Sequence, residues 1–261
     1  AVKRVGPDRF LLGEVWEDAT TKFGFNKRRT YLLGKGLDSV MNYPFKNAVL
    51  DFVKGKPAEQ AMTEILTICE HYPAPAMDTA LNFLSTHDTE RALTVIADEP
   101  ANGRGRAWQS GRCVTGDAYE EGLLRLRMAY AIIYTLPGVP CLYYGDEIAM
   151  QGYRDPFNRA FFRWDAHEQR LRPVLAQLAQ LRHTCEAFRT GQLRVLRAED
   201  GILHYQRVGK VETAEIIVNR TEHIIVETLA SGKSTEVNPM GFTIVVEEVG
   251  HNPNHSYYDY V

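Results

Sequence analysis

The sequence predicts an α/β protein in which part of a TIM-type barrel is followed by a small antiparallel β-sandwich. Up to residue 190, short apolar stretches alternate with longer stretches that have apolar residues at helical spacing, as in repeated strand-helix units. After Gly191, strand-like stretches follow one another closely without a helix between them. We therefore expect a barrel domain over residues 1–190, a sandwich over 191–250 and a polar, disordered tail over 251–261.

Apolar stretches in the first domain have the length of barrel strands, and they cover residues 9–16, 37–43, 80–84 and 139–144. Pro44 ends the second stretch, and Pro137 and Gly138 separate the fourth from the helix before it. Each stretch is short and bounded by such breakers, as expected for buried parallel strands.

Helical spacing of apolar residues predicts the helices between these strands, over residues 47–53, 59–70, 119–136 and 167–188. Residues 97–116 are rich in glycine and polar residues and are expected to form a surface loop. Residues 151–164 form a long aromatic loop, and loops after barrel strands usually carry binding residues.

The predicted strands of the sandwich cover residues 193–196, 202–206, 214–218, 223–226 and 242–246. They are rich in β-branched and apolar residues and closely spaced, which is typical of an antiparallel sheet.

The amino-acid composition narrows the classes of partner that this chain could bind. The formal net charge of −3 over 261 residues gives no basic field for nucleic acid or an anionic membrane, so neutral partners such as sugars fit better. No apolar run approaches the ~20 residues of a membrane helix, and without a visible signal peptide we expect a cytoplasmic protein. Cysteines are widely spaced and form no metal-binding or redox pair; they are Cys69, Cys113, Cys141 and Cys185.

Two carboxylates stand at the ends of apolar strands. Glu14 ends the run that begins at Phe10, and Asp88 ends the run that begins at Leu81. Because every strand of a parallel barrel delivers its carboxyl end to one rim, these residues can meet there although they are far apart in sequence. Paired carboxylates are the chemistry of glycoside hydrolysis.

The residues around these carboxylates resemble the alpha-amylase family of retaining glycoside hydrolases, especially its neopullulanase and cyclomaltodextrinase branch. The resemblance rests on residues 13–18 (GEVWED), 41–44 (MNYP), 83–89 (FLSTHDT) and 138–147 (GVPCLYYGDE), in that order. It implies that the barrel part is the C-terminal half of a TIM (β/α)8 barrel, with strands 5–8 and their helices, and that the strand-rich end is the small C-terminal domain of this family.

Two sequence words of that family are missing. The fourth-strand word Gly-x-Arg-x-Asp, whose aspartate is the nucleophile, does not occur, and neither does the third-strand word Asp-x-x-x-Asn-His. The resemblance therefore implies a C-terminal portion that carries the acid/base and the third carboxylate but lacks the nucleophile, and we expect no measurable hydrolysis by this chain alone.

By this resemblance, Glu14 is the general acid/base, and burial beside Trp16 would raise its pKa. Asp88 is the third carboxylate, which holds sugar hydroxyls, and His87 bonds the same sugar. Each has a structural alternative: Glu14 could end a strand or cap a turn, and Asp88 could cap the next helix.

Further residues are expected to bind substrate, and they are His87, Trp16, Tyr43, Arg91, Asp155 and Arg159. Trp16 and Tyr43 could stack on sugars or pack beneath the rim. Arg91 could pair with a carboxylate of the site or begin a solvated helix face. Asp146 and Glu147 follow the last strand and are expected to orient loops rather than to react.

The expected partner is an alpha-glucan oligosaccharide or polysaccharide. No cofactor or metal is indicated, although some members of this family bind calcium through residues outside this stretch. Glu17 stands where many members of the branch have a histidine. The type of glycosidic linkage that is cleaved therefore stays open, and so does the choice between hydrolysis and transglycosylation. A half barrel exposes two strand edges, and a homodimer or the missing N-terminal half could cover them. The alternative is a non-catalytic carbohydrate-binding or subunit-completing relative.

Overall fold

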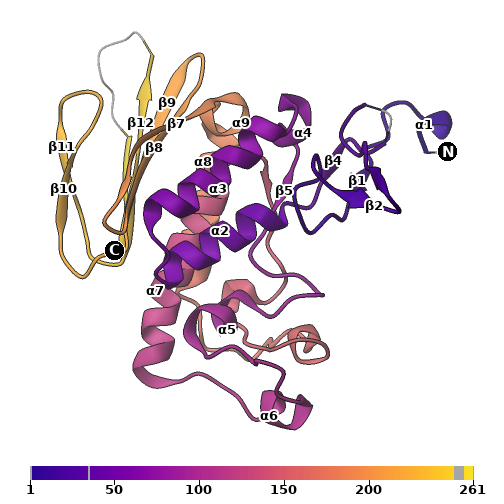
Figure 1. Cartoon of the computed structure of the whole chain (residues 1–261). Coiled ribbons are helices and arrows are strands. Elements are labelled where there is room, and N and C mark those ends of the chain that lie inside the picture. The colour runs from indigo at the N-terminus through magenta and orange to yellow at the C-terminus, as the bar shows by residue number, and fades with distance from the viewer. Residues whose placement is uncertain (1, 35, 250–255, 261) are drawn as a thin grey trace.

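The computed structural model describes residues 2–34, 36–249 and 256–260 (Figure 1). The chain begins with a short helix, α1 (Val2–Val5), and a first strand, β1 (Leu12–Gly13), and a small antiparallel hairpin follows, formed by β2 (Phe23–Gly24) and β3 (Lys27–Arg28). Figure 1 shows this segment projecting from one side of the helices, with the C-terminal sheet on the opposite side.

The centre of the fold is a ladder of short parallel strands in sequence order, made of β1, β4 (Ser39–Val40), β5 (Leu81–Asn82) and β6 (Val139–Pro140). Leu12 pairs with Ser39, a parallel bridge joins Met41 to Leu81, and Asn82 pairs with Pro140. The strands lie inside the predicted stretches but are shorter, because the chain turns out of the ladder soon after each pairing. All carboxyl ends lie at one edge.

Buried amides join the strands of this ladder. Asn42 donates from Nδ2 to Oδ1 of Asn82 over 2.9 Å, and Asn82 donates from Nδ2 to the carbonyl of Pro137 over 2.7 Å. Gly138 follows with φ +106°, and a Cβ there would stand 2.7 Å from the carbonyl of Ala80. Only glycine fits this conformation and this approach, so the contacts fix the register of β5 against β6.

Helix α2 (Tyr43–Lys54) is longer than the predicted 47–53. Asn42 caps it by accepting from the backbone N–H of Phe45, and Pro44 lies in its first turn. Pro44 is therefore a helix-starting residue as well as the end of a strand. Gly55, with φ +131°, turns the chain into the antiparallel helix α3 (Ala58–His71).

The remaining helices cover the ladder and lead to the sheet. The expected loop over residues 97–116 contains one helical turn, and the expected helix 167–188 begins later and divides at Cys185. The elements are α4 (Ala74–Asp78), α5 (Ala92–Ala97), α6 (Arg106–Ser110), α7 (Gly116–Thr135), η1 (Asp146–Ile148), η2 (Phe157–Arg159), α8 (Leu171–Thr184) and α9 (Ala187–Thr190).

After Gly191 the chain forms an antiparallel five-stranded sheet in the order β13-β12-β9-β8-β7. A separate hairpin, β10 with β11, lies over β9 and β12 and packs on Ile217 and Val245. The strands are β7 (Gln192–Glu199), β8 (Ile202–Val208), β9 (Glu212–Asn219), β10 (Ile225–Thr228), β11 (Ser234–Val237), β12 (Gly241–Glu248) and β13 (Ser256–Tyr260).

Residues 256–260, which fall in the expected tail, pair with β12 as strand β13. Residues 251–255 and 261, which also fall in the expected tail, lie outside the described residues. Strand β11 was not expected either, because its sequence, STEV, is largely polar.

One hydrophobic core runs across the boundary near Gly191. Tyr205 of β8 and Ile244 of β12 belong to the same buried cluster as Met62 of α3 and Ala129 of α7. The hydroxyl of Tyr205 also meets that of Thr135 at 2.6 Å. The sheet is therefore packed onto the helices rather than joined to them by a free linker.

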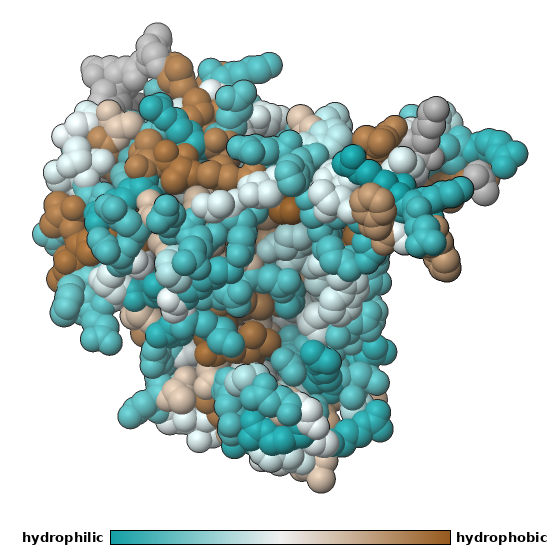
Figure 2. All heavy atoms as spheres, in the orientation of Figure 1, coloured by the Kyte–Doolittle hydropathy of each residue, from teal (hydrophilic) through white to brown (hydrophobic). Residues whose placement is uncertain are grey.

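The outer surface is largely hydrophilic on the face seen in Figure 2, with hydrophobic residues gathered over the C-terminal sheet and on the N-terminal segment. Exposed apolar side chains at these two places include Val226 and Phe23. Among the described residues, no helix has the length and apolarity to cross a membrane.

Lys46 of α2 is the first site for a test, because its side chain is only 8% exposed and burial lowers the pKa of its ammonium group to about 8. The folded protein therefore holds this proton less tightly than the unfolded chain does. The stability penalty is fully present below about pH 8 and disappears as the pH rises toward 10.5, and it is worth about 3 kcal/mol.

We expect Lys46→Met to raise the free energy of unfolding at pH 7 by up to about 3 kcal/mol and to have a much smaller effect at pH 10. Urea unfolding at both pH values measures this. Lys54→Met, on the exposed side of the same helix, is the control and should change stability by less than about 0.5 kcal/mol. Equal effects of the two substitutions at pH 7 would contradict the prediction.

Candidate active site

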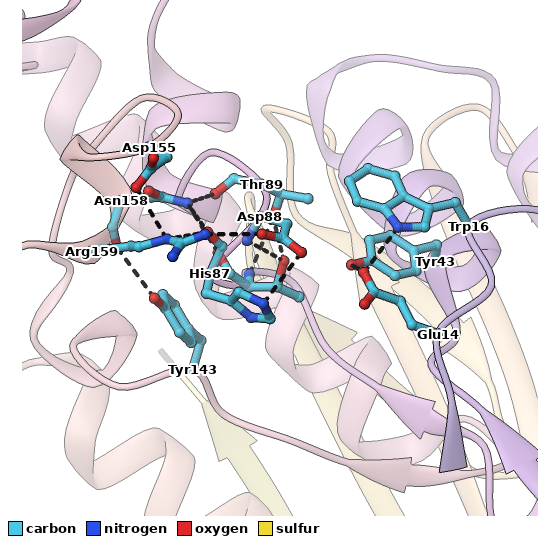
Figure 3. Close-up of polar contacts among 11 residues, drawn as sticks. Glu14, Trp16, Tyr43, His87, Asp88, Thr89, Tyr143, Asp155, Asn158 and Arg159 are labelled. Atoms are coloured by element: carbon cyan, nitrogen blue, oxygen red, sulfur yellow. Dashed lines mark hydrogen bonds and ion pairs between the residues drawn. The ribbon is translucent and has the colours of Figure 1, made fainter.

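The carboxyl edge of the parallel ladder carries most of the expected site residues (Figure 3). Glu14 and Trp16 follow β1, Tyr43 follows β4, and His87 and Asp88 follow β5. The loop after β6 adds Asp155 and Arg159, the latter within η2. The strand order therefore assembles residues that are up to about 145 positions apart in sequence.

Glu14 lies in an aromatic corner. Its Oε1 accepts hydrogen bonds from the indole Nε1 of Trp16 at 2.9 Å and from the hydroxyl of Tyr43 at 3.1 Å. The Trp16 ring stacks on Tyr43 with centroids 4.3 Å apart, and Tyr43 meets Phe83 edge to face at 4.9 Å. The rings and the two donors fix the position of the carboxylate.

The environment of Glu14 differs from the expected one. The sequence predicted that Glu14 is buried beside Trp16, but Glu14 is exposed and Trp16 is 48% exposed. Tyr43 is the buried member of this corner, with 1% exposure. The described residues cover one side of the carboxylate and leave the other side open.

Tyr43 bonds Glu14 and also feels the charge of Asp88. Burial is the main cause that raises the pKa of Tyr43 to about 12; the hydroxyl of Thr86 lowers it, while the negative charges of Glu14 and Asp88 raise it further. Figure 3 shows Glu14 next to Tyr43, with Asp88 on the neighbouring turn.

Asp88 is held by cationic and hydrogen-bonding neighbours. Arg159 donates from Nη2 to Oδ1 of Asp88 over 3.0 Å and from Nε to the carbonyl of His87 over 2.9 Å. The imidazole Nε2 of His87 lies 3.2 Å from Oδ2 of Asp88, and Asp155 pairs with Arg159 at 3.2 Å. His87, Asp88, Asp155 and Arg159 are thus brought together as one polar group.

Asn158 supports this group, and the sequence analysis did not assign it a role. Its side chain is fully buried, and Nδ2 donates to the carbonyls of His87 at 2.8 Å and Thr89 at 2.7 Å, with a longer contact to that of Thr86. The loop after β6 therefore holds the backbone of the turn that presents Asp88. The sequence shows an asparagine next to Arg159, but it reveals neither its burial nor its acceptors.

Arg91 was expected to bind substrate, and its two alternatives were to pair with a carboxylate of the site or to begin a solvated helix face. Its side chain is 0% exposed and pairs with the carboxylate of Asp146, so substrate binding and the solvated face are both corrected. It donates from Nη1 to Asp146 at 3.1 Å and to the carbonyl of Tyr144 at 2.6 Å, and the guanidinium lies 4.7 Å from the ring centroid of Tyr143. Because the pair is buried beneath the rim, Arg91 cannot touch a sugar.

Asp146 is the buried partner of Arg91, with 2% exposure. It also accepts from the hydroxyl of Tyr130 at 2.6 Å. Burial raises the pKa of Asp146, and bonds from Ser85, Tyr130 and Arg91 oppose this effect. Glu147 accepts from the backbone N–H of Gly145 at 2.7 Å, so both carboxylates shape the turn after β6.

Among the described residues, no group of three or more His, Cys, Asp or Glu side chains could hold a metal ion. The cysteines are free thiols, and burial raises the pKa of Cys69 to about 11.

Comparison with protein families identifies the class of protein to which this chain belongs. Residues 1–193 match the family model of the alpha amylase catalytic domain. The chain therefore belongs to the alpha-amylase catalytic-domain family of glycoside hydrolases.

Among curated relatives, a cyclomaltodextrinase from Geobacillus thermopakistaniensis (strain MAS1) is 33% identical over 227 residues, which cover 85% of this chain and 33% of the relative. Neopullulanase 2 from Thermoactinomyces vulgaris is 30% identical over 243 residues, covering 90% and 36%. The chain thus spans about a third of the length of these relatives.

Solved structures agree on the fold. A cyclomaltodextrinase structure superposes with a TM-score of 0.70 at 30% identity, over 87% of this chain and 35% of that one. A cyclic alpha-maltosyl-(1→6)-maltose hydrolase from Arthrobacter globiformis gives a TM-score of 0.77 at 23% identity, over 95% and 51%, which is a likeness of fold alone.

The role of Asn158 can be tested by stability. We expect Asn158→Ala to lower the free energy of unfolding by about 2–3 kcal/mol, because it leaves buried carbonyls of the Asp88 turn without a donor. Chemical denaturation measures the loss. Asn47→Ala, an exposed position on α2, is the matched control and should change stability by less than about 0.5 kcal/mol. A loss below about 1 kcal/mol would show that the Asp88 turn keeps its conformation without the hydrogen bonds from Asn158.

The Arg91–Asp146 pair provides a second test. Asp146→Asn leaves the buried guanidinium without its counter-charge and is expected to cost about 3–5 kcal/mol in the free energy of unfolding. Asp165→Asn removes an exposed carboxylate that pairs with Arg163 at 3.2 Å, and it should cost less than about 1 kcal/mol. Similar thermal unfolding of the two variants would argue against a structural role for the buried pair.

Proposed function

We propose that this chain is the C-terminal half of the catalytic barrel of a retaining alpha-glucan hydrolase, followed by its C-terminal sandwich domain. Glu14 is the general acid/base, and Asp88 is the third carboxylate. The observation that carries the proposal is the placement of both carboxylates at the carboxyl edge of the parallel ladder, with Glu14 after β1 and Asp88 after β5. Family membership supports the reaction class.

The bonds of Glu14 suit an acid/base. Among the described residues, Trp16 and Tyr43 both donate to Oε1, and Glu14 is exposed, so Oε2 faces the side open to a substrate. A general acid needs an oxygen within hydrogen-bond reach of the leaving group, and the fixed Oε1 keeps the other oxygen in a defined place. The same oxygen would later take a proton from water.

Asp88 suits the binding of sugar hydroxyls. Arg159 holds Oδ1, and the side chain is 35% exposed, so the carboxylate can still accept hydrogen bonds from a ligand. His87, with a side-chain exposure of 55%, adds a second polar contact beside it. Trp16 offers an aromatic ring, and Asp155 and Arg159 offer polar groups at the other end.

The nucleophile lies outside residues 1–261 in this proposal. A retaining mechanism needs two carboxyl groups about 5–5.5 Å apart across the sugar, and the sequence has no Gly-x-Arg-x-Asp word to supply the second one. Further barrel strands, from the same protein or from a second copy, would supply it and cover the edges of the ladder. Phe10, beside β1, is 54% exposed, and Val139 of β6 is 43% exposed, which supports such cover.

The substrate class is an alpha-glucan, linear or cyclic. Relatives are named cyclomaltodextrinase, neopullulanase and amylopullulanase, and these names agree on glucans while they differ in the particular one. A non-catalytic, carbohydrate-binding role is the second candidate, favoured by the missing nucleophile word and by the exposure of Glu14.

The test is hydrolysis of maltohexaose and β-cyclodextrin by this chain, with Glu14→Gln as the control. We expect no turnover by either protein, because one carboxyl of the reacting pair is missing. Turnover that Glu14→Gln lowers by about a thousandfold or more would place a nucleophile within this chain and contradict the half-barrel proposal. Turnover that is unaffected by Glu14→Gln would remove Glu14 as the acid/base.

A further inference from the structure

A buried cluster of charged side chains lies in the C-terminal domain, outside the candidate active site. His204 of β8 is at its centre and is 3% exposed, with Glu215 of β9 and Glu227 of β10 at its two ring nitrogens. We propose that His204 carries a proton on both nitrogens at neutral pH and clamps the β10–β11 hairpin onto the five-stranded sheet, and that a rise in pH loosens the hairpin.

Both ring nitrogens of His204 face a carboxylate. Nε2 lies 2.6 Å from Oε1 of Glu215, and Nδ1 lies 3.3 Å from Oε2 of Glu227. An ionised carboxylate only accepts hydrogen bonds, and a neutral imidazole has one donor and one acceptor nitrogen. A neutral ring would therefore direct a lone pair at one of the two carboxylates, whereas an imidazolium donates to both.

Glu215 is held in its ionised form. Burial raises the pKa of Glu215, but hydrogen bonds from His204, from Nε2 of Gln206 at 3.0 Å and from the backbone N–H of Ala230 lower it, and the pKa lies below its usual value. Because three donors point at this carboxylate, Glu215 does not carry a proton that it could donate to a bare nitrogen of His204.

The balance of charge agrees with an imidazolium. Glu227 also pairs with Arg197 of β7, so the cluster holds two carboxylates and one guanidinium besides the ring. With a neutral ring, one negative charge would be left over next to three buried side chains, and an unbalanced buried charge is costly. With an imidazolium, the positive and negative charges cancel.

Other charged groups lie around the cluster, and they are Arg194, Glu199, Asp200, Glu247 and Glu248. Glu199 and Asp200 are exposed and lie 3.0 Å and 3.9 Å from Arg197, and the other three line a small pocket beside Glu215. Strand β11 places the uncharged Thr235 opposite Glu227. Among the described residues, the ring itself bonds Glu215 and Glu227, so these two set its charge.

The hairpin depends on this cluster because its other contacts are few. β10 and β11 form a sheet of two strands, and Figure 1 shows them on the side of the five-stranded sheet that faces away from the helices. Their buried apolar contact consists of Leu229 and Val237 on Ile217 and Val245. A hairpin of two strands is marginal alone, so it can open locally while the rest of the domain stays folded.

The direction of the pH effect follows from the donors. As the pH rises and the ring loses one proton, one carboxylate loses its hydrogen bond and the cluster keeps an extra negative charge. The hairpin is therefore held at the lower pH, where the ring is charged, and loosened at the higher pH. Between pH 6 and pH 9, ordinary glutamates stay ionised, so the ring is the group of this cluster that titrates.

The experiment follows the ring and the hairpin together between pH 6 and pH 9. Nitrogen-15 NMR of the imidazole distinguishes a doubly protonated ring from a neutral one. Hydrogen exchange of the β10 and β11 amides, corrected for the intrinsic exchange rate at each pH, measures how often the hairpin opens, with β8 and β9 as the reference. His204→Gln removes the titrating ring, and His223→Gln, at an exposed position in the turn before β10, is the matched control.

We expect the ring of His204 to be doubly protonated at pH 6 and neutral at pH 9. The protection of the hairpin amides should fall about tenfold or more over this range, while that of β8 and β9 stays constant. His204→Gln should show the low protection at both pH values, and His223→Gln should behave as the wild type does.

A neutral ring at pH 6 would overturn the proposal, and so would a ring that is still charged at pH 9. Loss of the proton without a fall in protection would show that other contacts hold the hairpin. Wild-type protection of His204→Gln at pH 6 would remove the clamp in the same way. The ring and exchange measurements on the wild type decide the outcome even where His204→Gln does not fold.

Discussion

The buried amide of Asn82 is the contact on which the site geometry depends. It accepts from Asn42 after β4 and donates to Pro137 before β6, so one side chain joins three neighbouring parts of the parallel ladder. Buried amides must be paired, and the pairing exists in only one register, because a shift by one residue would leave these groups unsatisfied. The positions of Tyr43, His87 and the loop after β6 follow from that register.

The turn that carries Asp88 is then held from two sides. Beneath it, Arg91 pairs with Asp146 and so links the start of α5 to the turn after β6. Above it, Asn158 and Arg159 bond the backbone carbonyls of the turn. Asp146, Asn158 and Arg159 all come from the segment after β6, so that segment supports the turn that carries Asp88.

The sequence predicted the helices, the strands and the residues at the strand ends better than it predicted how buried each side chain is and what it contacts. The strand ends at Glu14 and Asp88 could be predicted, because a local run of apolar residues leads up to each of them. The burial of Arg91 could not be predicted. A charged residue after a strand has the same local sequence pattern whether it faces solvent or, as here, the buried Asp146. Asn158 was missed for the same reason, since its acceptors are about 70 residues away. Strand β13 was missed because its sequence, SYYDY, lies in a polar tail.

The exposure of Glu14 bears on how an acid/base would be made from it. A carboxylic acid that donates a proton near neutral pH must lose solvent, and the described residues shield Glu14 only through Trp16 and Tyr43. The remaining desolvation has to come from a bound sugar, from further barrel strands, or from both. The same surfaces would bring a nucleophile to the open side of Glu14. The pre-formed bonds to Oε1 are consistent with this order, because they orient the carboxyl group before it is covered.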